Sequence, residues 1–275
     1  MMWSLLKIQR PVATLTDKCL VLDIDETLVH TFDDGERINK NMIWNDPNLL
    51  ELRRRIYEIE LIDIAGIRGK GDYYKMSGIM RPYLKEFLSF CFNYFKVVAI
   101  WSAGKYEYVH AIVNQIFKDL PYPDAVYTRD DCELIDGSYV KPLSKMIDRE
   151  KHLNMSLNNT IILDDKNYTF YPNPQNGILI PGYYPSGASL DKLMIEDVAL
   201  YQFIAWLNKY LSQFSEAKDL RNLRMNAIFI TPLDELINDS YDDTSYNTNS
   251  DMRYMSYSPV RSTRNITYTP ILIAT

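Results

Sequence analysis

The chain has 275 residues, and its 30 Lys and Arg against 36 Asp and Glu give a formal charge of −6 at neutral pH. Hydrophobic residues make up 47% and charged residues 24%, which is ordinary globular usage and excludes a collagen-like or wholly disordered chain. The acidic balance argues against a broad surface for nucleic acid, so we expect no direct nucleic-acid partner.

Cysteine usage and hydropathy indicate the cellular compartment. The cysteines Cys19, Cys91 and Cys132 are too few and too scattered for a disulfide framework or a zinc site. Lys7 and Arg10 follow the apolar N-terminal residues too soon for a signal peptide, and no apolar run approaches the roughly 20 residues of a membrane span. We therefore expect a soluble cytoplasmic or nuclear monomer that is not secreted and does not engage membranes.

The first element in chain order is a buried strand. Residues 1–18 form an N-terminal extension, and Cys19–Ile24 is a short apolar run that ends in acidic residues. Such a run is typical of a buried strand in a parallel sheet. The mostly polar segment Phe32–Lys40 predicts a loop.

An insertion of about residues 35–79 follows this strand. A proline at an early position predicts a short helix from Pro47 through Leu52. The alternating segment Ile56–Ile64, three nearby glycines and the segment Asp72–Met80 predict two strands of a hairpin-like insertion.

Downstream of the insertion, helices and strands alternate. Apolar residues recur at helical spacing from Leu84 to Phe95, which predicts a helix that opens at Arg81-Pro82. We expect further strands at Lys96–Trp101, Ala125–Thr128 and Thr160–Leu163, and further helices at Tyr106–Phe117 and Leu190–Leu211. This alternation implies an α/β fold: a Rossmann-like parallel sheet flanked by helices, with right-handed crossovers and a small β insertion after the first strand.

The composition changes after about Phe214. Asp, Ser, Thr, Asn and Tyr dominate Asn238–Thr269, which predicts a disordered C-terminal tail. Within the stretch before it, Ala227–Ile237 is apolar enough to be a docking segment. We therefore place the catalytic domain at residues 19–214, and we expect residues 215–275 to be mostly disordered and dispensable for chemistry.

Three of the predicted strands end in polar residues. Asp23 and Asp25 follow the first, Ser102 follows the second, and Asp164 and Asp165 end the third. Ligands of open parallel sheets bind outside the carboxyl ends of the strands, so these groups should converge on one crevice. Carboxylates from two strands would repel one another unless a cation lay between them, and their hardness favours Mg²⁺.

The same crevice needs a group that neutralises a bound phosphate. Ser102 and nearby backbone N–H groups would hold phosphate oxygens, and Lys141, in SYVKPLSK, is the candidate cation. Lys145 is a rival for this role. Read alone, Asp23 and Asp25 would fit helix caps equally well, but the ordered set of motifs favours a phosphate site.

At this point the residues resemble a known family. DIDETLVH, a Ser-Ala-Gly motif, a downstream lysine and LDD look like the haloacid dehalogenase superfamily of aspartate-nucleophile phosphotransferases. Four stretches, DIDETLVH, RPYLKEFL, YTRDDCELIDGSYVKPLSK and IILDDKNYTFYPNPQNGILI, resemble its protein-phosphatase branch. That branch contains the phosphatases of the RNA polymerase II carboxy-terminal domain and the NLI-interacting-factor-like small phosphatases. The resemblance covers about Cys19 to Phe214.

The resemblance implies roles for the DxDxT residues. Asp23 would be the nucleophile and form an aspartyl phosphate. Asp25 would protonate the leaving serine oxygen and then deprotonate the attacking water, and Thr27 would orient Asp25.

It also implies how phosphate and metal are held. Ser102 and Lys141 would bind the phosphoryl group, and Arg129, in TRDDC, would contact the substrate phosphate. Asp23, the backbone carbonyl of Asp25, and Asp165 would ligate Mg²⁺. Asp164 would support Asp165 or share its role.

The resemblance favours a Mg²⁺-dependent protein serine/threonine phosphatase. Its expected substrate is a phosphoserine or phosphothreonine protein, with the RNA polymerase II carboxy-terminal domain as one candidate. Two alternatives remain open: a small-molecule phosphatase of the same fold, whose cleft the insertion would cover, and a phosphopeptide-binding scaffold that has lost turnover.

Overall fold

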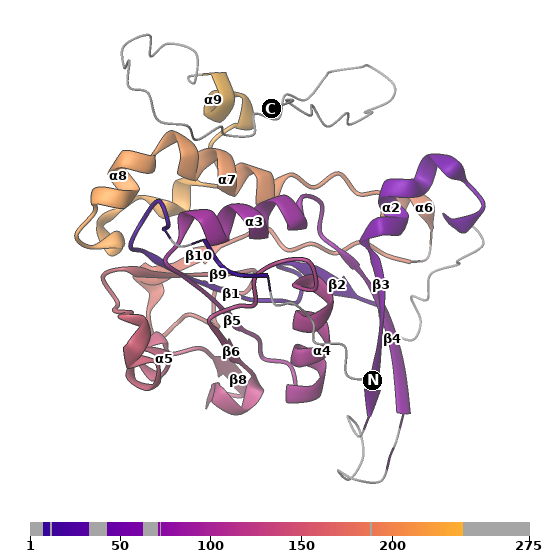
Figure 1. Cartoon of the computed structure of the whole chain (residues 1–275), viewed down its shortest axis with the longest axis horizontal. Helices are drawn as coiled ribbons and strands as arrows, with labels where there is room; N and C mark the ends of the chain where they lie inside the picture. The colour runs from indigo at the N-terminus through magenta and orange to yellow at the C-terminus, as the bar shows by residue number, and fades with distance from the viewer. Residues whose placement is uncertain are drawn as a thin grey trace. The chain divides into compact units, whose positions relative to one another are not determined.

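The computed structural model describes residues 8–11, 13–32, 43–62, 71, 73–187 and 189–238 (Figure 1). Its centre is a five-stranded sheet in the order β10-β9-β1-β5-β6, and every neighbouring pair is parallel. The strands are β1 (Cys19–Leu22), β5 (Val97–Trp101), β6 (Ala125–Tyr127), β9 (Thr160–Asp164) and β10 (Gly177–Leu179). The predicted parallel α/β sheet is confirmed, and β1 lies at its centre.

Helices cover both faces of this sheet, because side chains of successive strand residues point to opposite faces. The flanking helices are α3 (Leu84–Tyr94), α4 (Tyr106–Ile116), α5 (Leu143–Arg149) and α7 (Ala199–Lys209). Leu20 and Leu22 of β1 belong to the apolar cluster with α3, α4 and α7, whereas Cys19 and Val21 belong to the cluster with α5. Figure 1 shows α3 and α7 along one side of the sheet and α5 on the other.

The insertion forms a second sheet. Strands β2 (Val29–Thr31), β3 (Ile56–Ile62) and β4 (Tyr73–Met80) pair antiparallel in the order β2-β4-β3. The 3-10 turn Pro47–Leu49, capped by Asp46, leads into α2 (Leu50–Arg55). The two predicted strands are confirmed, whereas the three-residue strand β2 was too short to show alternation. The predicted loop after Phe32 falls within residues 33–42, which are outside the part of the chain that the structure describes.

Sequence analysis missed a tight hairpin, although its turn was legible. Strands β7 (Glu133–Ile135) and β8 (Ser138–Val140) are joined by Asp136-Gly137. Both turn residues have positive φ, 50° and 78°, as a type I′ turn requires. This hairpin delivers the chain to Lys141.

Two predicted helices differ from the structure. The helix after β4 begins at Leu84 rather than at Arg81, because Tyr83 has a left-handed φ of 65°. The segment Leu190–Leu211, which we expected to be mostly helical, is helical except at Met194–Val198 and Tyr210. The chain forms α6 (Leu190–Leu193), then α7, then α8 (Leu211–Glu216).

Residues 215–238, which include the expected docking segment Ala227–Ile237, are packed against the core. Leu220 and Ile228 are fully buried, and Leu236 of α9 (Leu233–Asn238) is 4% exposed; all three belong to the cluster with α3 and α7. The boundary at residue 214 is therefore too early for the packed structure, which extends at least to Leu236. The structure describes the chain only as far as residue 238, so the segment expected to be disordered lies almost wholly outside the described residues.

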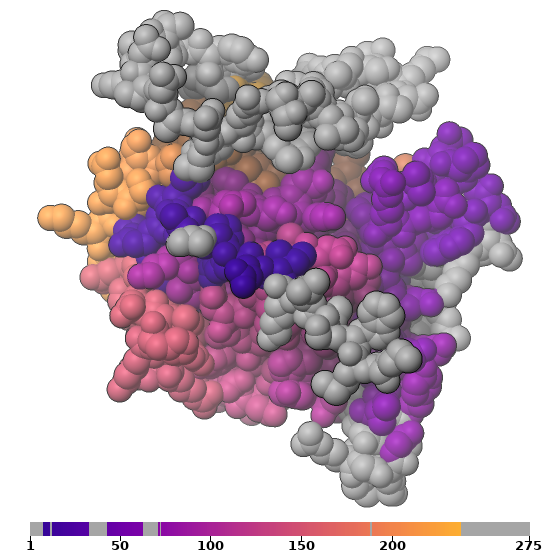
Figure 2. All heavy atoms as spheres, in the orientation of Figure 1, coloured from indigo at the N-terminus to yellow at the C-terminus, as the bar shows by residue number. Residues whose placement is uncertain are grey.

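The described part of the N-terminal extension is tied to the core. The Arg10 guanidinium forms an ion pair with Asp124, donates a hydrogen bond to the Phe95 carbonyl at 2.6 Å, and lies over the Phe92 ring. Figure 2 shows this segment in indigo on the surface of the molecule. Within the described residues, no helix has the length and apolar character needed to cross a bilayer.

A chain that ends after Phe214 should be much less stable than one that ends after Asn238, because it loses the burial of Leu220, Met225 and Ile228. Burying such a side chain contributes about 1.5–3 kcal/mol, so the three together contribute roughly 5 kcal/mol. Thermal unfolding of the two truncated chains should differ by about 10 °C or more. Equal unfolding midpoints would contradict the packing of residues 215–238.

Candidate active site

The carboxyl edge of the parallel sheet gathers the polar residues that the sequence places after separate strands. Asp23 follows β1, and its backbone N–H donates to the Leu163 carbonyl of β9 at 3.0 Å. Ser102 follows β5, and its N–H donates to the Tyr127 carbonyl of β6 at 3.1 Å. Asp164 ends β9. The parallel register therefore brings all three residues to one edge.

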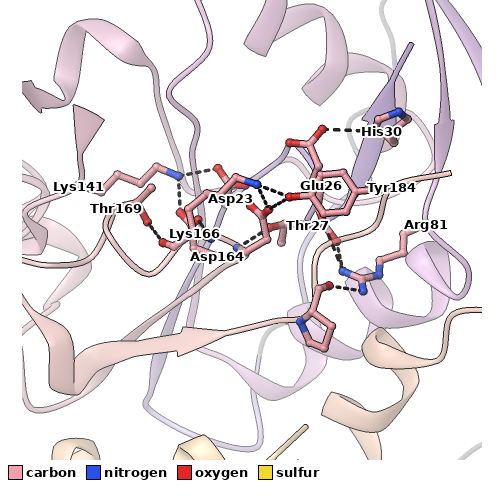
Figure 3. A network of polar contacts seen from close by, with 12 residues as sticks. Asp23, Glu26, Thr27, His30, Arg81, Lys141, Asp164, Lys166, Thr169 and Tyr184 are labelled. Atoms are coloured by element: carbon pink, nitrogen blue, oxygen red, sulfur yellow. Dashed lines mark hydrogen bonds and ion pairs between the residues drawn. The ribbon is translucent and has the colours of Figure 1, made fainter. Parts of the chain in front are cut away.

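Lys141 joins two of these carboxylates. Its ammonium donates to Asp23 Oδ1 at 2.5 Å and to Asp164 Oδ2 at 2.6 Å (Figure 3). The Lys141 side chain is 1% exposed, so both contacts are shielded from water. Lys145 instead donates to the Asp131 carbonyl at 2.7 Å. The geometry thus favours Lys141 over its rival.

Burial and charge set the protonation of this pair. Burial raises the pKa of Asp23 well above its ordinary value, and the Asp164 carboxylate raises it further, while Lys141 opposes both effects. Burial alone would lower the pKa of Lys141, but the Asp164 and Asp23 charges outweigh it, and the pKa is raised. Lys141 is therefore a permanent cation beside Asp23.

Asp25 occupies a different environment from Asp23. The Tyr108 hydroxyl donates to its Oδ1, and the Ser102 hydroxyl lies 3.3 Å from its Oδ2. Burial raises the pKa of Asp25 to about 6, against the opposing effect of the Tyr108 hydrogen bond. A carboxyl group with this pKa exchanges a proton readily near neutral pH, as an acid–base catalyst must.

Thr27 ties the loop after β1 to the loop after β9. Its side chain is fully buried, and its Oγ1 accepts a hydrogen bond from the backbone N–H of Asp165 at 3.2 Å. We expected Thr27 to orient Asp25. The observed contact instead acts on Asp165, so any effect of Thr27 on Asp25 passes through the backbone of the loop.

A buried arginine holds the same loop from the opposite side. Arg81 is fully buried and forms a two-pronged ion pair with Asp197, with both N–O distances at 2.8 Å. Its guanidinium also donates to the carbonyls of Thr27 at 3.1 Å and Pro181 at 2.6 Å (Figure 3). Arg81 therefore joins the loop after β1 to two segments near the C-terminal end of the domain.

Three carboxylates form a candidate metal centre. Asp23, Asp164 and Asp165 each offer an oxygen within 4.8 Å of the others. Lys166 donates to Asp165 Oδ2 at 2.5 Å, and Lys166 also contacts the Tyr184 hydroxyl. Carboxylate oxygens this close to one another suit a hard divalent cation such as Mg²⁺.

Charge balance is consistent with such a cation. Among the described side chains of this edge, Asp25 adds a fourth carboxylate, and Lys141 and Lys166 supply two ammonium groups. With all of them ionised, the charge is 2 − 4 = −2. One divalent cation would neutralise it. Asp25 does not belong to the three-residue cluster. The expected binding of the cation by the backbone carbonyl of Asp25 therefore stays a prediction.

Arg129 lies beside the loop that follows β5. Its Nε donates to the Ala103 carbonyl at 2.7 Å, and its guanidinium lies over the Tyr139 ring. Arg129 also lines a surface pocket of about 390 Å³ with Lys105, Tyr106, Glu107 and Asp130. The loop and the pocket are therefore adjacent.

Sequence reasoning missed several residues of this region. Tyr108 lies six positions after Ser102, in the first turn of the helix that follows the expected phosphate-binding motif. That position could have identified Tyr108 from the sequence as a neighbour of the site. Lys166 directly follows the paired aspartates, which is a second signal. The partnership of Arg81 with Asp197 spans 116 positions and leaves no local trace.

The chain is similar to several known proteins. The family model described as NLI interacting factor-like phosphatase matches residues 18–221. Nuclear envelope morphology protein 1 of Saccharomyces cerevisiae is 28% identical over 185 residues, which are 66% of this chain and 38% of that protein. CTD small phosphatase-like protein 1 of Caenorhabditis elegans is 25% identical over 178 residues, which are 65% of this chain and 30% of that protein.

Solved structures include a similar chain as well. Fcp1, described as an essential RNA polymerase II CTD phosphatase, is 19% identical with a TM-score of 0.46, and the match covers 85% of this chain and 56% of that one. The chain spans well under half the length of the two curated relatives above.

Replacing Arg81 by Met should destabilise the protein by about 3–5 kcal/mol, because it leaves Asp197 and the carbonyls of Thr27 and Pro181 without their fully buried partner. Arg54→Met is the matched control: Arg54 is 64% exposed in its pair with Glu51, so its loss should cost less than about 0.5 kcal/mol. Urea unfolding measures both changes. Similar losses of unfolding free energy for the two variants would show that the buried contacts of Arg81 contribute little to stability.

Proposed function

Because the chain belongs to the NLI interacting factor-like phosphatase family, whose model matches residues 18–221, we propose that it is a Mg²⁺-dependent phosphatase of phosphoserine or phosphothreonine in proteins. The observation that supports this most directly is the placement of Asp23, the first aspartate of DxDxT. It lies 2.5 Å from the Lys141 ammonium and in the cluster with Asp164 and Asp165.

In the proposed reaction Asp23 attacks the phosphorus. One of its carboxylate oxygens forms the new bond, the bond to the serine or threonine oxygen breaks, and an aspartyl phosphate results. Lys141 favours the anionic form of Asp23 in opposition to burial, and it would neutralise charge that gathers on the phosphoryl oxygens.

Asp25 supplies the proton in the first step and takes one in the second. The leaving oxygen receives the proton of the Asp25 carboxyl as its bond to phosphorus breaks. Water then attacks the aspartyl phosphate and gives its proton to Asp25, which releases inorganic phosphate and restores Asp23. The pKa of about 6 supports both directions of transfer.

Phosphate binding falls to the loop after β5. The Ser102 hydroxyl accepts a hydrogen bond from the Gly104 N–H at 2.9 Å, and this loop leads into the N-terminus of α4, where backbone N–H groups favour anions. A Cβ at Gly104 would lie 2.8 Å from the Tyr108 ring, so the glycine allows the loop to pass close to that ring. Arg129, at the adjacent pocket, would contact the phosphate or its flanking residue.

Asp23, Asp164 and Asp165 would hold Mg²⁺, with the backbone carbonyl of Asp25 as a further ligand. When bound, this ion supplies positive charge that stabilises the phosphoryl group during transfer.

A protein substrate is supported by the names of the relatives and by the surroundings of the site. Relatives carry names of nuclear envelope and CTD phosphatases. In this chain the pocket lined by Arg129 lies on the surface beside the phosphate loop, where residues that flank a phosphoserine would fit. We therefore propose a phosphoprotein substrate in the cytoplasm or nucleus, with the carboxy-terminal domain of RNA polymerase II as a candidate.

Asp23→Asn should lower phosphate release from phosphoserine peptides at least about a thousandfold, because an amide is a poor nucleophile. The change also removes one charge from a crowded site, so the fold should persist. Phosphate release from a panel of phosphopeptides and phosphorylated metabolites measures the effect, with Asp119→Asn at an exposed position as the control.

Two outcomes would contradict the proposal. Retention of more than a few per cent of wild-type turnover in Asp23→Asn would show that another group is the nucleophile. Wild-type turnover confined to the metabolites would make the protein a small-molecule phosphatase.

Chelation by EDTA should reduce turnover at least about a hundredfold, and added Mg²⁺ should restore it, because the carboxylate cluster and the phosphate need a shared cation. Trifluoroberyllate, which mimics an aspartyl phosphate, should inhibit only when Mg²⁺ is present. Full turnover in excess chelator would exclude the proposed cation.

A further inference from the structure

A chain of three hydroxyl groups leads from the insertion to the proposed acid–base residue. Tyr57 Oη lies 2.6 Å from Thr31 Oγ1, and Thr31 Oγ1 lies 2.7 Å from Tyr108 Oη. Tyr108 in turn contacts Asp25 Oδ1. The three residues come from β3, β2 and α4, so the insertion sheet and the core each contribute to the chain.

The chain is buried and closely fitted. Tyr57 is 2% exposed and Tyr108 is 8% exposed. A Cβ at Gly78, the residue paired with Tyr57 on β4, would lie 2.3 Å from the Tyr57 hydroxyl. Glycine at this position therefore leaves the space that the hydroxyl of Tyr57 needs to reach Thr31.

The hydrogen bonds have one consistent direction when Asp25 is ionised. A carboxylate only accepts, so Tyr108 donates its single proton to Asp25 Oδ1. Thr31 then donates to Tyr108, and Tyr57 donates to Thr31. Each tyrosine and threonine hydroxyl carries one proton, so each can donate in this direction.

We propose that Tyr57, acting through Thr31 and Tyr108, is a positioning residue for the Asp25 carboxyl. The hydroxyl chain engages Oδ1, so that Oδ2, which lies 3.3 Å from the Ser102 hydroxyl, is the oxygen that carries and transfers the proton. This inference rests on the proposed acid–base role of Asp25. No proton moves along the chain, because the proton on Oδ2 passes directly to the leaving oxygen.

The proposal predicts a dependence on the leaving group. A serine alkoxide is a poor leaving group and needs protonation as its bond to phosphorus breaks, whereas p-nitrophenolate leaves with little help. Misplacing Oδ2 should therefore slow formation of the aspartyl phosphate far more from phosphoserine than from p-nitrophenyl phosphate. Hydrolysis of the aspartyl phosphate is the same step for both substrates, so the comparison uses kcat/KM, which ends with formation of that intermediate.

The test uses Tyr57→Phe and Thr31→Val in the full chain, since each removes one hydroxyl and nearly preserves shape. Each variant should lower kcat/KM about tenfold on a phosphoserine peptide and less than about twofold on p-nitrophenyl phosphate. Tyr94→Phe is the control: Tyr94 is equally buried, and its hydroxyl contacts the Leu207 carbonyl at 3.4 Å, away from Asp25. This control should leave both rates unchanged.

The outcomes separate this inference from the proposed function. A wild-type chain that hydrolyses neither substrate refutes the phosphatase. A wild-type chain that hydrolyses both, with variants whose two kcat/KM values fall equally or do not fall, refutes the positioning role. If Tyr57→Phe fails to fold by circular dichroism, the ratio measured for Thr31→Val decides.

Discussion

The contact on which the site depends is the buried Lys141 ammonium between two carboxylates. Because β1 and β9 are neighbours in register, Leu22 opposite Leu163, the aspartates that follow them meet at one edge of the sheet. Two carboxylates cannot share a buried edge without a cation, and Lys141 supplies it at 2.5 and 2.6 Å. The same charge that allows the sheet to end in aspartates also opposes the effect of burial on the pKa of Asp23.

A second layer of contacts holds the loop of residues 23–27 without touching the reacting groups. Thr27 accepts a hydrogen bond from the backbone of Asp165, and the backbone N–H of Tyr183 donates to the Glu26 carbonyl at 2.8 Å. Arg81 adds its ion pair with Asp197 and its bonds to backbone carbonyls. Glu26 has a left-handed φ of 58°, so these contacts together stabilise a turn that the residue alone would not favour.

The insertion is integrated with the half of the molecule that carries the candidate active site. An apolar cluster of its own joins Phe32, Leu52 and Ile79 to Tyr183 and Leu193, which lie far downstream in the chain. Figure 1 shows α2 and α6, which contribute Leu52 and Leu193 to this cluster, next to each other. Tyr57 extends the insertion inward to the surroundings of Asp25. The region that would meet a substrate is thus coupled by packing and by hydrogen bonds to the region that would act on it.

Local patterns in the sequence determined β1, β5, β6 and β9 of the parallel sheet, the helices α3, α4 and α7, and the residues at the carboxyl edge, but not the strand β10 or the helix α5. Short apolar runs that end in acids, and helical spacing after Arg81, are readable because they depend on near neighbours in the chain. Only the tertiary structure decided which lysine enters the site, which tyrosine contacts Asp25, and how far the packed C-terminal part extends. Those outcomes depend on partners such as Lys141 and Asp23, 118 positions apart, or Arg81 and Asp197, 116 apart. No local pattern records such a pairing, because the energy of a buried ion pair or of packed side chains exists only once the chain has folded.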